Sequence, residues 1–232
     1  ESAVDEAIAP IYTSYKNVQT SILFNKTEIE IHLAARADSE TKAEKTLDEL
    51  SEKIAEKMGT PLFARNGETM EEVVGALLKD RGETIAVAES CTGGLISMRL
   101  TETPGSSAYL MEGIVAYSNE AKMHTVNVPA EILEQFGAVS EQTAEAMAVG
   151  ARERAGTTYA ISVTGIAGPD GGTEEKPVGT VCIGFADSDG AKSLKLLFPG
   201  DRYLIRWRSS QAALDYLRRQ IIKRSKPTVA RK

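Results

Sequence analysis

The stretch Ile85-Ala86-Val87-Ala88-Glu89-Ser90-Cys91-Thr92-Gly93-Gly94 decides how this chain is interpreted. Its start, over residues 85–88, is apolar and partly β-branched, which is typical of a strand buried on both faces of a sheet. Polar side chains and two glycines follow, and residues 95–100 predict the first turns of a helix. In open α/β sheets, ligands bind beyond the carboxyl ends of strands, where helix N-termini present free N–H groups. The stretch therefore predicts a ligand site, with Ser90 as a candidate nucleophile.

A plainer interpretation of the same residues is purely structural. Ser90 or Thr92 could cap the following helix through a side-chain oxygen, and the two glycines could simply close the turn. The stretch alone favours neither interpretation.

Composition limits the class of protein. With 232 residues, 42% hydrophobic and 26% charged, the chain has the composition of an ordinary globular protein with one large domain or two smaller ones. No apolar run approaches the roughly 20 residues of a membrane span, and no signal peptide opens the sequence, so we expect a cytoplasmic protein without a membrane partner. The net charge of −6 argues against general nucleic-acid binding.

Cysteines and histidines are too few for a disulfide framework or a typical zinc site. The two cysteines, Cys91 and Cys182, fit a protein of the reducing cytosol. Together with His32 and His124 they match no common zinc-ligand spacing. We therefore expect no metal.

The first 67 residues predict a small α+β unit. Its predicted elements, in order, are strands over 18–24 and 28–34, a helix from Ser39 to Gly59 and a short strand over 61–64. This order is ββαβ. The polar residues Arg65-Asn66-Gly67 are interpreted as a linker.

Residues 68–224 predict a larger unit in which helices and strands alternate, which indicates a layered α/β domain. Predicted helices lie over 69–82, from 95, from 118, over 129–136, 141–155 and 204–222, and predicted strands over 85–88, 109–117, 159–163, 179–186 and 192–198. The basic tail over 225–232 is expected to be disordered.

Three predicted strands end at polar or glycine-rich turns, which we expect to meet at one rim of the sheet. These turns contain Ser90, Tyr117-Ser118 and Thr164-Gly165. A serine nucleophile needs a base within hydrogen-bonding reach, and Lys122 lies one helical turn past Ser118. A lysine desolvated in a pocket can lose its proton near neutral pH, and Ser-Lys pairs are a known amide-cleaving arrangement. A solvated surface lysine is the alternative for Lys122.

Other candidates carry weaker signals. Cys91 is a rival nucleophile with His124 as its base. His32 lies in the predicted hairpin and is interpreted as a surface residue or as one whose hydrogen bonds are satisfied there. The glycine-rich loop 164–172 could cradle a phosphate through its N–H groups, but it matches neither the Walker A nor the dinucleotide-binding pattern. Arg202 and Arg206, at the start of the last helix, could hold an anionic substrate.

Six motifs in order resemble those of one known family, the competence/damage-inducible protein CinA. They are 88–94 (AESCTGG), 117–122 (YSNEAK), 137–140 (GAVS), 164–172 (TGIAGPDGG), 176–181 (KPVGTV) and 200–202 (GDR). Residues 68–222 resemble the CinA C-terminal domain, which also occurs alone as nicotinamide-nucleotide amidase. Residues 1–65 resemble the KH-like middle domain of full-length CinA.

The resemblance implies a three-layer α/β/α domain with a mixed sheet, preceded by a small α+β KH-like domain. It implies hydrolysis of the carboxamide of nicotinamide mononucleotide (NMN) to nicotinic acid mononucleotide and ammonia, as a homodimer and without a cofactor. Full-length relatives carry a further, molybdopterin-binding-like domain that these residues lack, so we expect no pyrophosphatase activity. Nucleic-acid-binding KH folds clamp the backbone with a Gly-X-X-Gly loop. Residues 1–67 contain only Gly59 and Gly67, so we do not expect RNA binding.

The resulting hypothesis is an amidohydrolase with Ser90 as nucleophile, neutral Lys122 as general base and Tyr117 as the residue that relays or orients the proton. Backbone N–H groups near Gly93-Gly94 or near Thr164-Gly165 would stabilise the oxyanion. The full set of expected oxyanion- and substrate-binding residues is Thr92, Gly93, Gly94, Ser118, Thr164, Gly165, Arg202 and Arg206. The alternative function is a non-catalytic scaffold linked to DNA uptake or repair.

Overall fold

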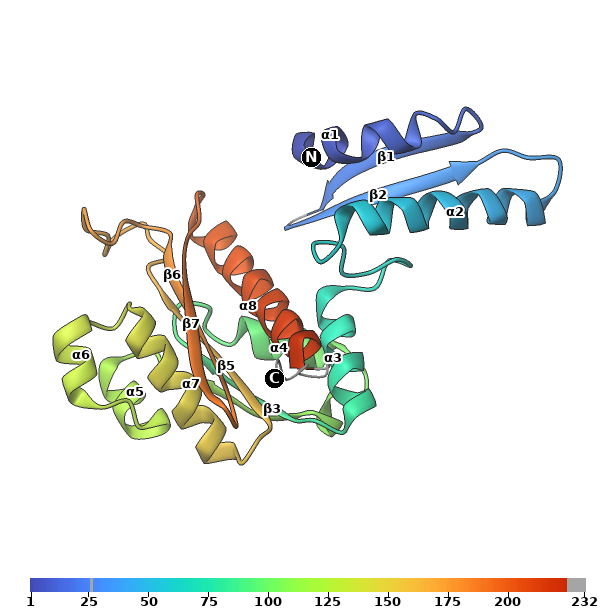
Figure 1. Cartoon of the computed structure of the whole chain (residues 1–232). Helices are drawn as coiled ribbons and strands as arrows, with labels where there is room; N and C mark the ends of the chain where they lie inside the picture. Colours follow the sequence, from blue (N-terminus) through green and yellow to red (C-terminus); the bar gives the residue numbers. More distant parts are fainter. Residues whose placement is uncertain (26, 225–232) are drawn as a thin grey trace, which may run out of the picture. The chain divides into compact units, whose positions relative to one another are not determined.

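The computed structural model describes residues 1–25 and 27–224 (Figure 1). The tail over 225–232, predicted to be disordered, lies outside the described residues. The chain divides into two compact units, Glu1–Glu68 and a second unit that begins at Thr69. No helix in the described ranges combines the length and the apolar character needed to cross a membrane.

The first unit packs two helices against a β-hairpin. Its elements are α1 (Ser2–Tyr12), β1 (Val18–Asn25), β2 (Glu28–Ala35) and α2 (Glu40–Met58). The strands are antiparallel, with Val18 opposite Ala35. Ile8 of α1 and Leu50 and Ile54 of α2 are buried together against apolar side chains of the hairpin. This cluster is the core of the unit.

The hairpin and the capped helix of the first unit are confirmed, but the predicted order ββαβ is wrong. Ser39 accepts a hydrogen bond from the Lys42 N–H, and α2 ends at Gly59, whose φ is 58°. Helix α1 escaped prediction because it has no side-chain N-cap and contains Pro10. The segment 61–64 is not a strand, since no neighbouring strand among the described residues pairs with it. The order is therefore αββα.

The second unit is built on a five-stranded mixed sheet in the order β4-β3-β5-β6-β7. The strands are β3 (Ile85–Glu89), β4 (Leu110–Val115), β5 (Tyr159–Gly165), β6 (Thr180–Asp187) and β7 (Gly190–Leu197). β3 runs parallel to β4 and β5, whereas β6 and β7 are antiparallel to their neighbours. All of β3 is buried; the apolar run over 85–88 predicts this, and the burial extends to Glu89 at the end of the strand.

Helices cover both faces of this sheet (Figure 1). They are α3 (Met70–Arg81), α4 (Leu95–Glu102), α5 (Asn119–Val126), α6 (Ala130–Phe136), α7 (Glu141–Ala155) and α8 (Arg202–Arg224), with a 3₁₀ turn at Ser106–Ala108. α7 packs on one face together with α5 and α6, and α8 packs on the other with α3 and α4. The predicted three-layer α/β/α architecture is confirmed.

The strand order places a crevice where the sequence predicts a site. The chain leaves β3 toward β4 on one side and reaches β5 on the other, so β3 stands at a topological switch point. Because the three strands are parallel, their carboxyl ends share one rim, and the turns after them bring Ser90, Tyr117 and Gly165 together there.

Candidate active site

A tight turn follows β3 and carries the candidate nucleophile. The Ser90 N–H donates to the Val163 carbonyl of β5 at 2.9 Å, and the Ser90 carbonyl accepts from the Gly93 N–H at 3.0 Å. Gly93 and Gly94 have φ values of 60° and 92°, in the left-handed region that favours glycine. The turn therefore presents Ser90 at the strand end and leads directly into α4.

Lys122 reaches Ser90 from the neighbouring helix. Ser118 caps α5 by accepting the Ala121 N–H, and this sets the helix so that Lys122 points inward. The Lys122 Nζ lies 3.0 Å from the Ser90 Oγ and 3.1 Å from each of the Ala116 and Tyr117 carbonyl oxygens. Only 1% of Lys122 is exposed. A solvated surface lysine, the alternative interpretation, does not describe this buried residue.

The surroundings of Lys122 favour its neutral form. Burial lowers the pKa of the Lys122 amine, and its partners among the described residues are one hydroxyl and two carbonyls, with no carboxylate. A neutral amine has two N–H donors and one lone pair. With the carbonyls of Ala116 and Tyr117 accepting both donors, the lone pair is left to face the Ser90 hydroxyl. This is the arrangement that a general base requires.

The surroundings of the rival nucleophile, Cys91, disfavour its reactive thiolate form. Cys91 is buried, and this burial raises the pKa of its thiol to about 12. Its proposed base, His124, is an exposed residue of α5 that does not line the pocket. His32 is also exposed and forms an ion pair with Glu30 in the first unit. A protonated thiol without a base is a poor nucleophile.

The pocket above Ser90 has a volume of about 240 Å³. The residues that line it come from all three strand ends, from the start of α5 and α8, and from the loops before α7 and after β5. They are Ser90, Cys91, Tyr117, Ser118, Asn119, Lys122, Ala138, Val139, Thr164, Gly165, Ala167 and Arg202. Sequence reasoning gave no role to the apolar members Ala138, Val139 and Ala167, because nothing in their residue type signals a site.

Tyr117 contacts Lys122 through its backbone. Its side chain is exposed, and its hydroxyl accepts a hydrogen bond from the Arg202 Nη2 at 3.1 Å. The Arg202 Nη1 donates to the Gly168 carbonyl at 2.9 Å. Arg202 therefore ties the rim of the pocket to the glycine-rich loop after β5, and Tyr117 orients Lys122 by its carbonyl oxygen.

Four residues of the expected binding set do not line the pocket, namely Thr92, Gly93, Gly94 and Arg206. The Gly93 N–H donates a hydrogen bond to the Ser90 carbonyl, and the Gly94 N–H donates to a carboxylate oxygen of Glu89 at 3.0 Å. Arg206 donates through its Nη2 and Nε to the Thr92 carbonyl, at 2.6 and 3.3 Å. These hydrogen bonds hold the turn that carries Ser90 in place, and they occupy the N–H groups of Gly93 and Gly94.

Two other expected residues, Thr164 and Gly165, line the pocket. Thr164 is buried, and its hydroxyl donates to the Ala138 carbonyl at 2.7 Å, which fixes the loop before α7. A Cβ on Gly165 would lie 2.8 Å from the Thr180 carbonyl oxygen and 3.1 Å from the Cys91 sulfur. Only glycine fits at this position without a shift.

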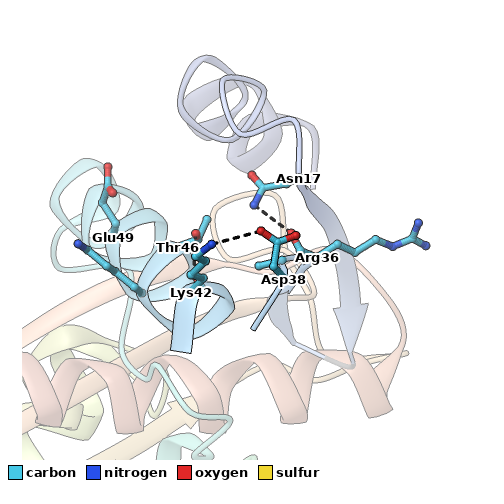
Figure 2. A pocket seen from close by; sticks show the side chains of 8 residues that line it. Asn17, Arg36, Asp38, Lys42, Thr46 and Glu49 are labelled. Carbon is cyan, nitrogen blue, oxygen red and sulfur yellow. Dashed lines mark hydrogen bonds and ion pairs between the residues drawn. The ribbon is translucent and has the colours of Figure 1, made fainter. Parts of the chain in front are cut away.

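A larger hollow, of about 480 Å³, lies in the first unit (Figure 2). It is lined mostly by exposed polar and charged side chains, and Asn17 donates to the Arg36 carbonyl while Lys42 pairs with Asp38. It contains no nucleophile beside a base, so the smaller pocket at Ser90 is the candidate active site. No group of three or more potential metal ligands gathers anywhere in residues 1–25 and 27–224.

Family models match both units. Residues 67–221 match the model described as the CinA C-terminal domain, and residues 1–64 match the damage-inducible protein CinA KH domain. A CinA-like protein of Koribacter versatilis is 48% identical over 222 residues, and one of Synechocystis sp. is 47% identical over 224 residues. These matches cover 96% and 95% of this chain and 54% of each relative. The chain thus spans about half the length of the curated relatives it matches.

Solved structures resemble the chain over about the length of its second unit. The crystal structure of the competence/damage inducible protein CihA from Agrobacterium tumefaciens is 41% identical, with a TM-score of 0.63, and the match covers 67% of this chain and 96% of that one. A competence-damaged protein (CinA) superfamily member from Klebsiella pneumoniae is 30% identical, with a TM-score of 0.64, covering 67% and 99% of the two chains.

Proposed function

The chain belongs to the CinA family, and from this premise we propose that its second unit hydrolyses the carboxamide of NMN to nicotinic acid mononucleotide and ammonia. One observation carries the proposal: the buried Lys122 amine, with a lowered pKa, lies 3.0 Å from the Ser90 hydroxyl at the floor of a pocket. Buried lysines beside a serine and without a counter-ion suit proton abstraction better than structural support.

The first half of the reaction forms an acyl-enzyme. The Ser90 Oγ attacks the carboxamide carbon while its proton moves to the lone pair of Lys122, and the carbonyl electron pair moves onto oxygen. As the tetrahedral intermediate collapses, the Lys122 ammonium gives a proton to the departing nitrogen, so the C–N bond breaks and ammonia leaves. Lys122 is neutral again, and Ser90 carries the acyl group as an ester.

The second half hydrolyses this ester. Lys122 takes a proton from a water that attacks the acyl carbon, and it returns the proton to the Ser90 oxygen as the C–O bond breaks. The products of the two halves are the carboxylic acid and ammonia, and the enzyme is unchanged. Ala116 and Tyr117 support both charge states of Lys122, because their carbonyls accept N–H groups from the amine and from the ammonium alike.

The pocket suits a flat ring that carries a phosphate arm. Ala138, Val139 and Ala167 supply apolar contacts for a pyridinium ring. Arg202 stands at the rim with guanidinium donors beyond the two that bond Gly168 and Tyr117, and these could bind a phosphate. Arg206, whose guanidinium bonds the nucleophile turn, is not assigned to the substrate.

The test is ammonia release from NMN by the intact chain and by the Ser90→Ala variant. We expect turnover by the wild-type chain and a loss of at least about 10⁴-fold in the variant, in line with losses of an active-site nucleophile elsewhere. If the wild-type chain releases no ammonia from NMN or related amides, the amidase proposal fails. The non-catalytic scaffold would then be the better account.

The activity should depend on pH through Lys122. Since the neutral amine is the base and burial lowers its pKa, kcat/KM should rise with pH and level off below pH 10.4, where an ordinary lysine titrates. Measurements above pH 7 avoid the second ionisation of the substrate phosphate, near pH 6. A rate that still climbs tenfold per pH unit beyond 10.4 would favour Cys91, whose thiol has a pKa raised to about 12.

A further inference from the structure

The first turn of α4, the usual place for an anion to bind, is already occupied by the protein itself. Glu89 is fully buried and directly precedes Ser90. Its carboxylate accepts the N–H groups of Gly94, Ile96 and Ser97 at 2.9–3.1 Å, and the Ser97 hydroxyl at 2.8 Å. A buried carboxylate at a helix N-terminus neutralises the dipole and uses the donors that would otherwise bind an anion. The oxyanion of the proposed reaction must therefore find its donors elsewhere.

The ladder of backbone hydrogen bonds between β3 and β5 ends at Ser90. Its last hydrogen bond, or rung, runs from the Ser90 N–H to the Val163 carbonyl. In a parallel ladder the next rung would run from the Gly165 N–H to the Ser90 carbonyl. That rung is not formed among the described residues, because the chain turns and the Ser90 carbonyl accepts from the Gly93 N–H instead.

The Gly165 N–H faces this missing rung. On the other side of β5, the Ile166 N–H donates to the Thr180 carbonyl, and hydrogen-bonded pairs of an antiparallel ladder alternate. Gly165, which lies opposite Val181, therefore directs its N–H away from β6 and toward the end of β3. Gly165 also lines the pocket, so this donor is within reach of a ligand.

Cys91, the residue after Ser90, carries a second N–H group beside the nucleophile that is unpaired among the described residues. Cys91 and Thr92 occupy the centre of the turn closed by Gly93, and neither has a positive φ, which indicates a type I turn. Within the described part of the chain, the Cys91 N–H donates to no acceptor on another residue. Cys91 lines the pocket, whereas Thr92 is fully buried and does not.

We propose that the N–H groups of Cys91 and Gly165 form the oxyanion hole at the missing rung between β3 and β5. The inference rests on the proposed amidase reaction, in which Ser90 holds the acyl carbon beside both donors. As the electron pair of the substrate carbonyl moves onto its oxygen, that oxygen accepts hydrogen bonds from the Cys91 and Gly165 N–H groups. It thereby takes the place of the Ser90 carbonyl, which would accept from Gly165 in a continued ladder. The N–H of the residue after a nucleophile has this role in other strand-turn-helix hydrolases. Glycine at 165 also keeps the two donors close, because a Cβ there would meet the Cys91 sulfur.

The test compares Cys91→Pro with Cys91→Ala. Both variants remove the thiol, but only proline removes the N–H, and proline is favoured at the first central position of a type I turn. We expect kcat for ammonia release from NMN to be about 10²–10³-fold lower in Cys91→Pro than in Cys91→Ala, with KM changed by less than about threefold, because an oxyanion donor acts mainly in the transition state.

Equal kcat values in the two folded variants would overturn the oxyanion hole and leave the amidase proposal standing. A wild-type chain that releases no ammonia would overturn both. If Cys91→Pro shows no cooperative unfolding, an amide-to-ester replacement of Gly165 by glycolate decides the question, since it removes one N–H and adds no bulk. The same fall in kcat is then expected relative to wild type, and an unchanged kcat would overturn the inference.

Discussion

Lys122→Met should lower kcat for ammonia release from NMN by about 10⁴-fold, the upper end of what a general base contributes. The reason is geometric: the Lys122 Nζ is 3.0 Å from the Ser90 Oγ, and no His or carboxylate lines the pocket to replace it. Methionine keeps much of the apolar stem but cannot accept the serine proton. The measurement is steady-state ammonia release by purified variant and wild-type protein.

Lys192→Met provides the matched control. Lys192 is an exposed lysine of β7 and does not line the pocket, so this variant should keep the wild-type rate. Trp207, the one tryptophan of the chain, lies in α8 and reports unfolding of the second unit by fluorescence. A Lys122→Met protein that unfolds like wild type and retains its activity within tenfold would rule out Lys122 as the base.

Of the substitutions proposed here, Glu71→Ala should lower the free energy of unfolding of the second unit the most. The Glu71 carboxylate lies 2.7 Å from the Arg99 Nη2, and both residues are buried between α3, α4 and α8. Arg99 also bonds Ser210 and Gln211 and lies over the ring of Trp207. Removing one partner of a buried pair leaves an uncompensated charge and typically costs about 3–5 kcal/mol. In a unit of this size, that is a fall of about 6–20 °C in Tm.

The double variant Glu71→Leu/Arg99→Met removes both charges, and so distinguishes the effect of an unpaired buried charge from that of losing the ion pair itself. Replacing a buried ion pair by apolar residues of similar size is often neutral or stabilising, so the double variant should recover most of the lost stability. Thermal unfolding followed by Trp207 fluorescence compares wild type with both variants. A Glu71→Ala variant that loses less than about 1 kcal/mol would show that the pair does not hold the three helices together.

The contact between Ser90 and Lys122 could be predicted because its signals are local. The apolar run over 85–88 predicts a buried strand, and the two glycines at 93 and 94 predict the turn that carries Ser90. Ser118, as a cap, fixes the register of α5 and therefore the direction of Lys122. The resemblance to one family suggested the proposed substrate, which no residue spacing could supply.

The remaining features depend on long-range geometry. The two carbonyls that orient Lys122 and the Gly165 N–H, which is unpaired within the described ranges, are backbone groups, and the residue types of Ala116, Tyr117 and Gly165 do not reveal which way these groups point. In the sequence, Glu89 is one polar residue among several. Only the fold shows that its carboxylate accepts hydrogen bonds from N–H groups at the start of α4. Likewise, the sequence suggested that Arg206 contacts the substrate, whereas in the packed α8 its guanidinium donates to the Thr92 carbonyl.

The most direct test of the account is the position of the covalent acyl group during turnover. The chain is mixed with NMN, quenched in acid within milliseconds and digested, and the peptides are analysed by mass spectrometry. We predict an adduct of NMN minus ammonia on Ser90, and its absence in the Ser90→Ala variant. An adduct on Cys91, or ammonia release at the wild-type rate by Ser90→Ala, would contradict the account.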